Sequence, residues 1–190
     1  MAEVKFLDLA VNDTLVSTTG TVQTSFCLIP QGTGESERIG RKVWATALHL
    51  RGNRFTAAIN DSNAPEGDAV RIMVLLDKQA NGANYTAADV LSDTDINGMY
   101  KPDNQDRFLV LYDETEGVNY RAGAGHASTD DYPGVVYPFE ESIPLDHPLE
   151  FSGTAGAVTE LRSNNIALLA ISKNGVAGLE FLGRLEYVDG

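Results

Sequence analysis

The chain has 190 residues, and its 27 acidic against 14 basic residues give a formal charge of −13 at pH 7. With 43% hydrophobic and 22% charged residues it has the composition of a globular protein, which excludes the disordered and fibrous classes. No apolar run reaches the length of a membrane-spanning helix, so no membrane partner is expected. An acidic chain also disfavours nucleic-acid binding, because phosphate binding requires lysines and arginines that release counterions.

Almost all predicted elements are β-strands, because short apolar runs are separated by glycine, proline and asparagine. In chain order, the expected strands cover residues 4–10, 22–29, 42–51, 70–77, 107–112, 135–140, 149–151, 166–172 and 179–188. One short helix is expected at 85–91, where Thr86 is a suitable N-cap.

The last expected strand alternates apolar residues such as Leu179 and Phe181 with polar ones such as Glu180, which is typical of an antiparallel strand with one buried face. Long loops over 53–68 and 115–133 favour a sandwich over a barrel of tight hairpins. The sequence therefore predicts an all-β fold, a single jelly-roll β-sandwich of two antiparallel sheets with long connecting loops, in one domain over residues 1–190.

The strand expected at 42–51 carries the only tryptophan of the chain. Trp44 shares its parity with Leu48 and Leu50, so a regular strand would place all three on one face. We therefore predict that Trp44 points between the two sheets, and that its replacement by alanine costs roughly 3–5 kcal/mol of stability.

Five of the 14 basic residues lie within 17 positions around the start of this strand. They are Arg38, Arg41, Lys42, Arg51 and Arg54. A dense basic group is the best candidate for nucleic-acid contact in an acidic chain. The alternative, that these side chains pair with the abundant carboxylates at subunit contacts, is favoured by the acidic balance.

The sequence contains few candidates for catalytic or metal-binding chemistry. His49, His126 and His147 are scattered and no nucleophile motif is present, so we expect no enzymatic activity and no cofactor.

The segment 93–98, with Asp93, Asp95, Asn97 and a glycine, copies the first half of a calcium loop, but Asn104 stands where the bidentate carboxylate belongs. An Asx-rich turn without metal is the favoured interpretation. The acids Asp61, Glu66 and Asp68 are likewise expected to be solvated loop residues.

Several segments resemble one viral family in their order along the chain. They are 29–52 (IPQGTGESERIGRKVWATALHLRG), 70–79 (VRIMVLLDKQ), 107–113 (RFLVLYD), 149–153 (LEFSG), 165–172 (NIALLAIS) and 183–189 (GRLEYVD). Together they resemble coat proteins of circovirus-like circular single-stranded DNA viruses.

The resemblance implies a structural capsid protein that self-assembles into a T=1-like icosahedral shell of 60 copies around a small single-stranded DNA genome. Such a protein resides in the virion, and in the host cell during assembly. Members of that family usually begin with an arginine-rich arm, whereas no basic arm is expected here, so nucleic-acid binding should be weak or absent. The alternative function is a calcium-dependent, lectin-like binding module that uses Asp93, Asp95 and Asn97 for the ion and Tyr100 for a sugar.

Overall fold

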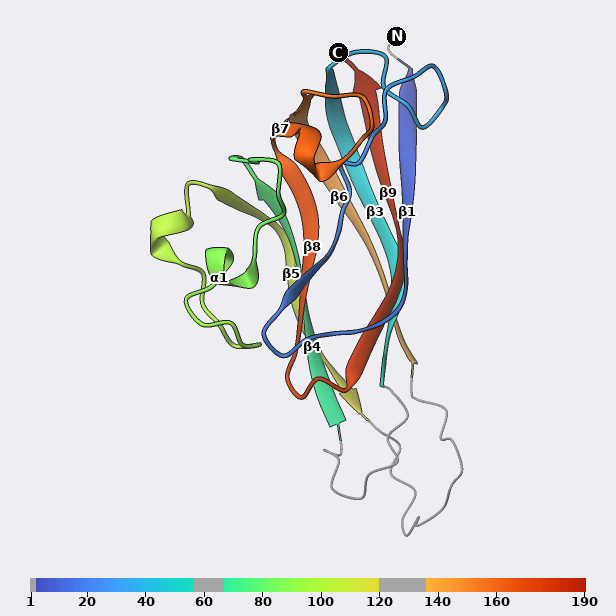
Figure 1. Ribbon diagram of the computed structural model, residues 1–190. Helices are drawn as coiled ribbons and strands as arrows, with labels where there is room; N and C mark the ends of the chain where they lie inside the picture. The colour runs from blue at the N-terminus through green and yellow to red at the C-terminus, as the bar shows by residue number, and fades with distance from the viewer. Residues whose placement is uncertain (1–2, 57–66, 120–135) are drawn as a thin grey trace.

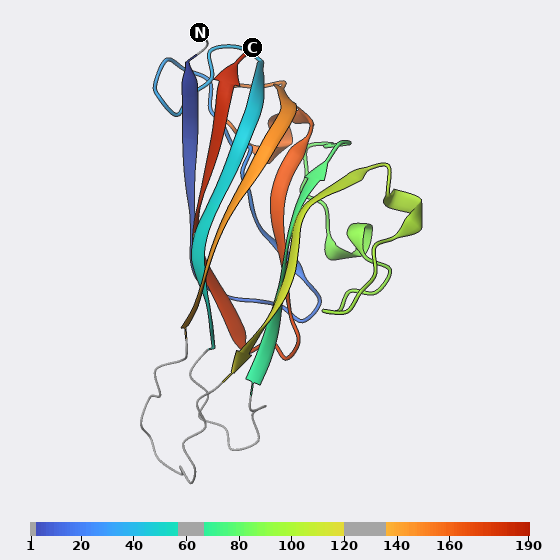
Figure 2. The same ribbon diagram turned by 180° about the vertical axis from the view of Figure 1, so that it is seen from behind.

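The computed structural model describes residues 3–56, 67–119 and 136–190, which form two antiparallel sheets packed face to face (Figures 1 and 2). Sheet A has the order β1-β9-β3-β6-β7, with bounds Val4–Leu15, Ala177–Asp189, Lys42–Thr56, Val136–Phe151 and Leu161–Ser163. Sheet B has the order β2-β8-β4-β5, with bounds Thr21–Ser25, Asn165–Ser172, Gly67–Asp77 and Phe108–Asn119. Short helical turns α1, η1 and η2 cover Ala87–Val90, Pro102–Asn104 and Val158–Glu160.

The order of strand pairing identifies the topology. β4 pairs with β5, β3 with β6, β2 with β8 and β1 with β9, all antiparallel. The first four strands thus pair with later strands in reverse order, as the two arms of one long hairpin would. Because successive strands of each arm alternate between the sheets, this hairpin is rolled around the core, which is the jelly-roll arrangement. The predicted fold class is confirmed.

Two hydrophobic cores flank sheet B. The main core lies between the sheets and contains fully buried side chains such as Leu48, Ile72 and Leu168. A smaller core lies on the other face of sheet B, where Leu75 and Leu169 pack under the segment between β4 and β5 that contains α1 (Figure 1). The central strands of sheet B, β4 and β8, are therefore buried on both faces, whereas sheet A contributes only its inner face to a core.

This difference accounts for the two hydrophobic patterns in the sequence. Every residue of β8 is buried, and so is nearly every residue of β4, which explains why VRIMVLL and NIALLAI are continuous apolar runs. β6 and β9 alternate buried and exposed positions instead. A strand with one wet face alternates, because successive side chains point to opposite sides.

The predicted inward orientation of Trp44 is wrong. The side chain is 37% exposed and lies on the outer face of sheet A. The inward positions of β3 are Val43 and Ala45 before the shift and Leu48 and Leu50 after it. Its pairing with both neighbouring strands shifts register between residues 45 and 47, and the extra residue of such a bulge inverts the parity of everything beyond it.

β6 joins two strands that were predicted separately, 135–140 and 149–151. Pro138, Pro144 and Pro148 interrupt the pattern between them. On one side β6 pairs with β3 along its length, and on the other β7 reaches only Glu150 and Phe151. A strand with one largely free edge accommodates proline without losing ladder hydrogen bonds.

The expected helix is present but short, because α1 comprises only Ala87–Val90. The Asp89 carboxylate accepts hydrogen bonds from both the backbone N–H and the hydroxyl of Thr86, each at 2.8 Å, so the predicted N-terminal residue is confirmed. Tyr85 donates its hydroxyl to the carbonyl of Ala167 in β8 at 2.8 Å, which fastens this segment to sheet B. In the described parts of the chain, no helix has the length and apolar content that a membrane crossing requires.

Candidate functional surface

Arg38, the first residue of the predicted basic group, is fully buried. Its guanidinium donates hydrogen bonds to the carbonyls of Ile29, at 3.1 Å, and of Gly40 and Gly153. It also lies 4.1 Å from the ring centre of Phe151. Burial lowers the pKa of this guanidinium, and the hydrogen bonds compensate part of the cost of removing the charge from water. Arg38 therefore holds two loops together and is out of reach of a nucleic acid.

Arg54 is also unavailable, with 3% of its surface exposed. It lies beyond the bulge on the inward side of β3, where it pairs with Glu114 and covers the ring of Phe139 at 5.0 Å. Glu114 accepts a second hydrogen bond from the Tyr112 hydroxyl at 2.6 Å, so the carboxylate is held from two sides. Two of the five residues of the predicted basic group, Arg38 and Arg54, are therefore buried.

The remaining members are exposed but divided between two places. Arg41 and Lys42 stand at the start of β3, whereas Arg51 lies nine residues along the strand from Lys42, roughly 30 Å away by strand rise. Arg162 on β7 is exposed and lies about two strand spacings, or roughly 10 Å, from Lys42 through the intervening Glu150. Arg162 is absent from the predicted basic group, because its proximity to Lys42 follows only from the order of strands in sheet A.

Among the described residues, four lysines and arginines outside the predicted basic group form ion pairs within the chain. The pairs are Lys5–Asp189 at 2.9 Å, Arg71–Asp113 at 2.6 Å, Arg107–Asp77 at 2.7 Å and Arg184–Asp8 at 2.6 Å. Lys42 has a looser contact with Glu150 at 3.7 Å. The excess of carboxylates therefore neutralises much of the positive charge inside the subunit.

The segment that copies half of a calcium loop forms a turn closed by an arginine. The backbone N–H of Asn97 donates to the Asp95 carboxylate at 2.6 Å, which is the Asx turn that was favoured. Nη1 of Arg71 donates to the carbonyls of Gly98 at 2.7 Å and Ile96 at 3.3 Å, so a cationic side chain already binds carbonyls of this loop. Among the described residues, no three His, Cys, Asp or Glu side chains are grouped as a metal site.

Arg71 also anchors Asp113, which accepts two hydrogen bonds from it at 2.8 and 2.6 Å and a third from the Tyr100 hydroxyl at 2.6 Å. Burial would raise the pKa of Asp113, but these hydrogen bonds outweigh it and hold the pKa below its ordinary value. Tyr100, the residue proposed for sugar contact, is thus committed to an internal network. An arginine inside the apolar run VRIMVLL was a signal that a buried carboxylate partner exists.

Asp68 is not the solvated loop acid that the sequence suggested, while Asp61 and Glu66 lie outside the described residues. Its carboxylate is buried and accepts hydrogen bonds from the Ser172 hydroxyl at 2.5 Å and from the backbone N–H groups of Asn174 and Ala177, at 2.9 and 2.8 Å. It therefore organises the turn between β8 and β9 and is a structural residue.

The outer face of sheet A is covered by no described segment (Figure 2). Its exposed or half-buried outward residues on β3 are Lys42, Trp44, His49, Arg51 and Asn53. Those on β6 are Glu140, Ser142, Pro144, Asp146, Pro148 and Glu150. We call these two sets the basic stripe and the acidic stripe. The two stripes are adjacent and opposite in charge, which suits contact with another protein surface.

Hydrogen bonds across the sheet hold several of these side chains in place. Nε1 of Trp44 donates to the Asp146 carboxylate at 2.5 Å. His49 lies 3.0 Å from the Ser142 hydroxyl and 3.5 Å from the carboxylate of Glu186 on β9. The exposed indole is thus fixed in one orientation, which reduces the entropy that it would lose on binding a partner.

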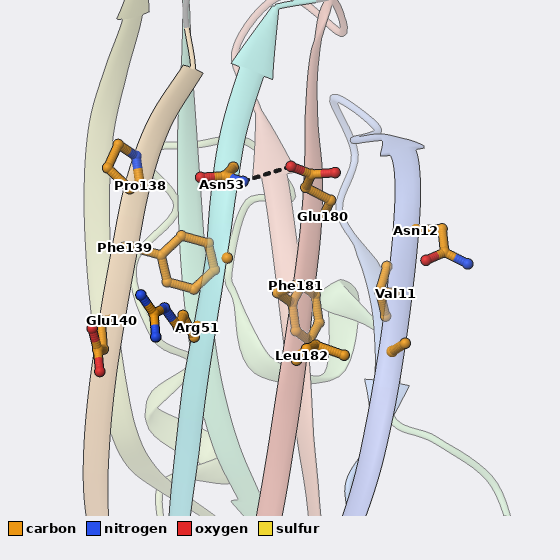
Figure 3. Close-up of a pocket in the computed structure, with 12 residues that line it drawn as sticks. Val11, Asn12, Arg51, Asn53, Pro138, Phe139, Glu140, Glu180, Phe181 and Leu182 are labelled. Atoms are coloured by element: carbon orange, nitrogen blue, oxygen red, sulfur yellow. Dashed lines mark hydrogen bonds between the residues drawn. The ribbon is translucent and has the colours of Figure 1, made fainter.

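An open hollow of ≈ 820 Å³ lies at the far end of this face, lined by β1, β3, β6 and β9 (Figure 3). Arg51 and Glu140 lie beside one another on neighbouring strands, and Asn53 donates to the Glu180 carboxylate at 2.5 Å. Leu182, 61% exposed, adds an apolar contact. The described residues of the lining include no histidine, cysteine or serine, so this hollow offers binding contacts and no evident nucleophile.

Comparison with known proteins places this fold among viral coat proteins. The coat protein of maize white line mosaic satellite virus is 29% identical over 179 residues, which cover 93% of this chain and 75% of that protein. The family model of the satellite tobacco necrosis virus coat protein matches residues 1–190. The expected capsid role is therefore confirmed at this level, while the circovirus-like assignment is not supported by either match. This chain belongs to the satellite tobacco necrosis virus coat protein family.

Proposed function

We propose that this chain is the subunit of a small icosahedral shell, built from 60 identical copies around a small single-stranded genome. The observation that carries the proposal is the match of the whole chain to a coat-protein family. Such a subunit resides in the virion, and in the host cell during assembly. Its role is structural: it encloses nucleic acid by binding copies of itself.

The form of the subunit supports this role. A closed shell requires each copy to bind its neighbours through several surfaces at once. The jelly roll supplies a rigid sandwich, and the outer face of sheet A adds a broad surface with both signs of charge. Internal ion pairs and buried hydrogen bonds engage other charged groups, among them Arg38, Arg71 and Arg107, and so stiffen the building block.

We further infer that the shell binds its genome weakly through the described residues. The chain has 27 acidic against 14 basic residues, and Arg38 and Arg54 are buried. Arg41 and Arg162 form the best remaining basic group, at one end of sheet A. The prediction of a circovirus-like single-stranded DNA genome stays a prediction, since both matches name satellite viruses.

Assembly is tested on the purified chain by sedimentation and negative-stain microscopy. We expect a uniform megadalton-scale particle with a thin shell, because coat subunits bury large contacts with one another. A clean monomer of 20.4 kDa across a range of salt and calcium concentrations would contradict the proposal and favour a binding module.

Genome binding is tested on the same particles by ultraviolet absorbance and by nuclease digestion, with DNase and RNase used separately to identify the nucleic acid. We expect little protected nucleic acid, and we expect it to fall further in the double variant Arg41→Glu, Arg162→Glu and with rising salt. Lys78→Glu, at an exposed lysine in the turn that follows β4, is the matched control. Particles filled with protected nucleic acid in the double variant would contradict the inference.

A further inference from the structure

We propose that the outer face of β3 and β6 binds the same face of a second copy of this chain, around a twofold axis that runs parallel to the strands. The inference rests on the proposed function, because it assigns one of the contacts that the shell needs. It goes further by naming the surface, the symmetry and the residues that meet.

One end of this surface, next to Lys42, carries an apolar row. Val4, Val188, Trp44 and Pro148 are register partners on β1, β9, β3 and β6, so they form one row across four neighbouring strands. Val4 is 59% exposed and Trp44 37% exposed. A contiguous apolar row on a free sheet face marks a protein contact, and tryptophan is the residue most enriched among side chains that dominate such contacts.

The two stripes make the face complementary to itself. A twofold axis parallel to the strands, located between β3 and β6, places the basic stripe of each copy over the acidic stripe of the other. The axis keeps height along the strands unchanged, and within the subunit Lys42 is level with Glu150 and Arg51 with Glu140. The same pairs would therefore meet between copies, and each contact would occur twice.

Arg51 and Glu140 are the residues that most directly support a contact with a second copy. Among the described residues, neither side chain has a hydrogen bond or ion pair, although both are exposed and lie on adjacent strands. A second copy would supply Glu140 to Arg51 and Arg51 to Glu140. At the same time Trp44 would pack against Pro148 of the second copy, where its bond to Asp146 already fixes the indole.

The charge pattern favours a second copy over nucleic acid as the occupant. A strand of phosphates on this face would lie against Glu140, Asp146 and Glu150 of the acidic stripe. On the neighbouring strand, Arg184 is held by Asp8 through two hydrogen bonds, at 2.6 and 2.7 Å, and so cannot compensate. A surface with alternating stripes is attractive to its own rotated copy and repels a uniform polyanion.

Self-complementarity allows a test by mixing two defective variants. In Arg51→Glu, two pairs of carboxylates face one another in the dimer, and in Glu140→Arg, two pairs of guanidinium groups do. We expect each variant alone to fold but to lose particle formation. An equimolar mixture should assemble, because every contact between unlike copies then joins a glutamate at 51 to an arginine at 140, or the original pair.

The tryptophan gives a second readout, since it is the only one in the chain. Assembly should shift Trp44 emission to shorter wavelength and protect it from acrylamide quenching. Trp44→Ala should unfold with a midpoint near that of the wild type, yet raise the protein concentration needed for assembly by about tenfold or more. Met99→Ala is the matched control, because Met99 is exposed in the segment that covers the outer face of sheet B.

The outcomes separate this inference from the proposed function. If the wild type forms shells while both charge variants assemble normally alone, the twofold contact is wrong and the coat function stands. Trp44 emission that does not change on assembly also overturns the contact. If the emission changes but nuclease treatment reverses the change, nucleic acid and not a second copy covers the face. If the wild type forms no shell, the proposed function fails, and sedimentation equilibrium of the same variants and their mixture still decides whether the dimer exists.

Discussion

Sheets A and B are built from similar numbers of strands but differ in what their outer faces meet. The outer face of sheet B lies under its own chain, because the segment with α1 packs on Leu75 and Leu169. The outer face of sheet A carries Trp44, Leu182 and two charged stripes without such a cover in the described residues. The central strands of sheet B thus bury both of their faces within the subunit, whereas sheet A leaves its outer face exposed.

The largest effect is expected from a cavity in the covered sheet. Leu75→Ala should lower the free energy of unfolding by about 2–5 kcal/mol, because Leu75 is fully buried between sheet B and its cover. Leu182→Ala on the free face should change it by less than about 0.5 kcal/mol. Denaturant unfolding of both variants tests this contrast. Equal decreases in the free energy of unfolding would show that the outer faces of the two sheets contribute equally to stability.

An intermediate effect should separate buried from exposed arginines. Arg38→Met keeps much of the apolar volume but leaves the carbonyls of Ile29, Gly40 and Gly153 without their donor, so we expect a loss of about 2–3 kcal/mol. Arg41→Met should be nearly neutral, because Arg41 is exposed. Thermal unfolding at one pH measures both. A neutral Arg38→Met would show that these hydrogen bonds contribute little net stability.

The smallest effect is the pH dependence contributed by Asp68. Burial would raise the pKa of this carboxyl, but hydrogen bonds from Ser172 and from backbone N–H groups outweigh burial and hold the pKa below its ordinary value. Its stabilising contribution is therefore complete above the unfolded-state pKa of about 4 and is lost as pH falls through the lower folded-state pKa.

The comparison with Asp68→Asn isolates this contribution from the other carboxylates. The wild type should be the more stable above about pH 4, and the difference should shrink as the pH is lowered further. Unfolding curves of both chains at a series of acid pH values measure it. A difference that stays constant with pH would remove Asp68 from the groups that link folding to protonation.

Sequence patterns were reliable where burial is uniform along a strand. The continuous apolar runs of β4 and β8 and the alternation in β9 each indicated a strand, because the two-residue period of side chains follows directly from backbone geometry. The patterns failed across 141–148, where prolines obscured β6, and at β7, where three residues are too few to show a period.

The sequence by itself determined the all-β class, the near-complete set of strands and an excess of negative charge. Only the tertiary structure decided which side Trp44 faces, because one bulge residue inverts the parity of β3 without altering its composition. It also decided that Arg38 is buried and Arg41, three residues later, is exposed. Local periodicity determines that buried and exposed positions alternate along a strand. Strand register and loop packing join residues far apart in the chain, and they determine which set of positions faces the core and which side chains pair.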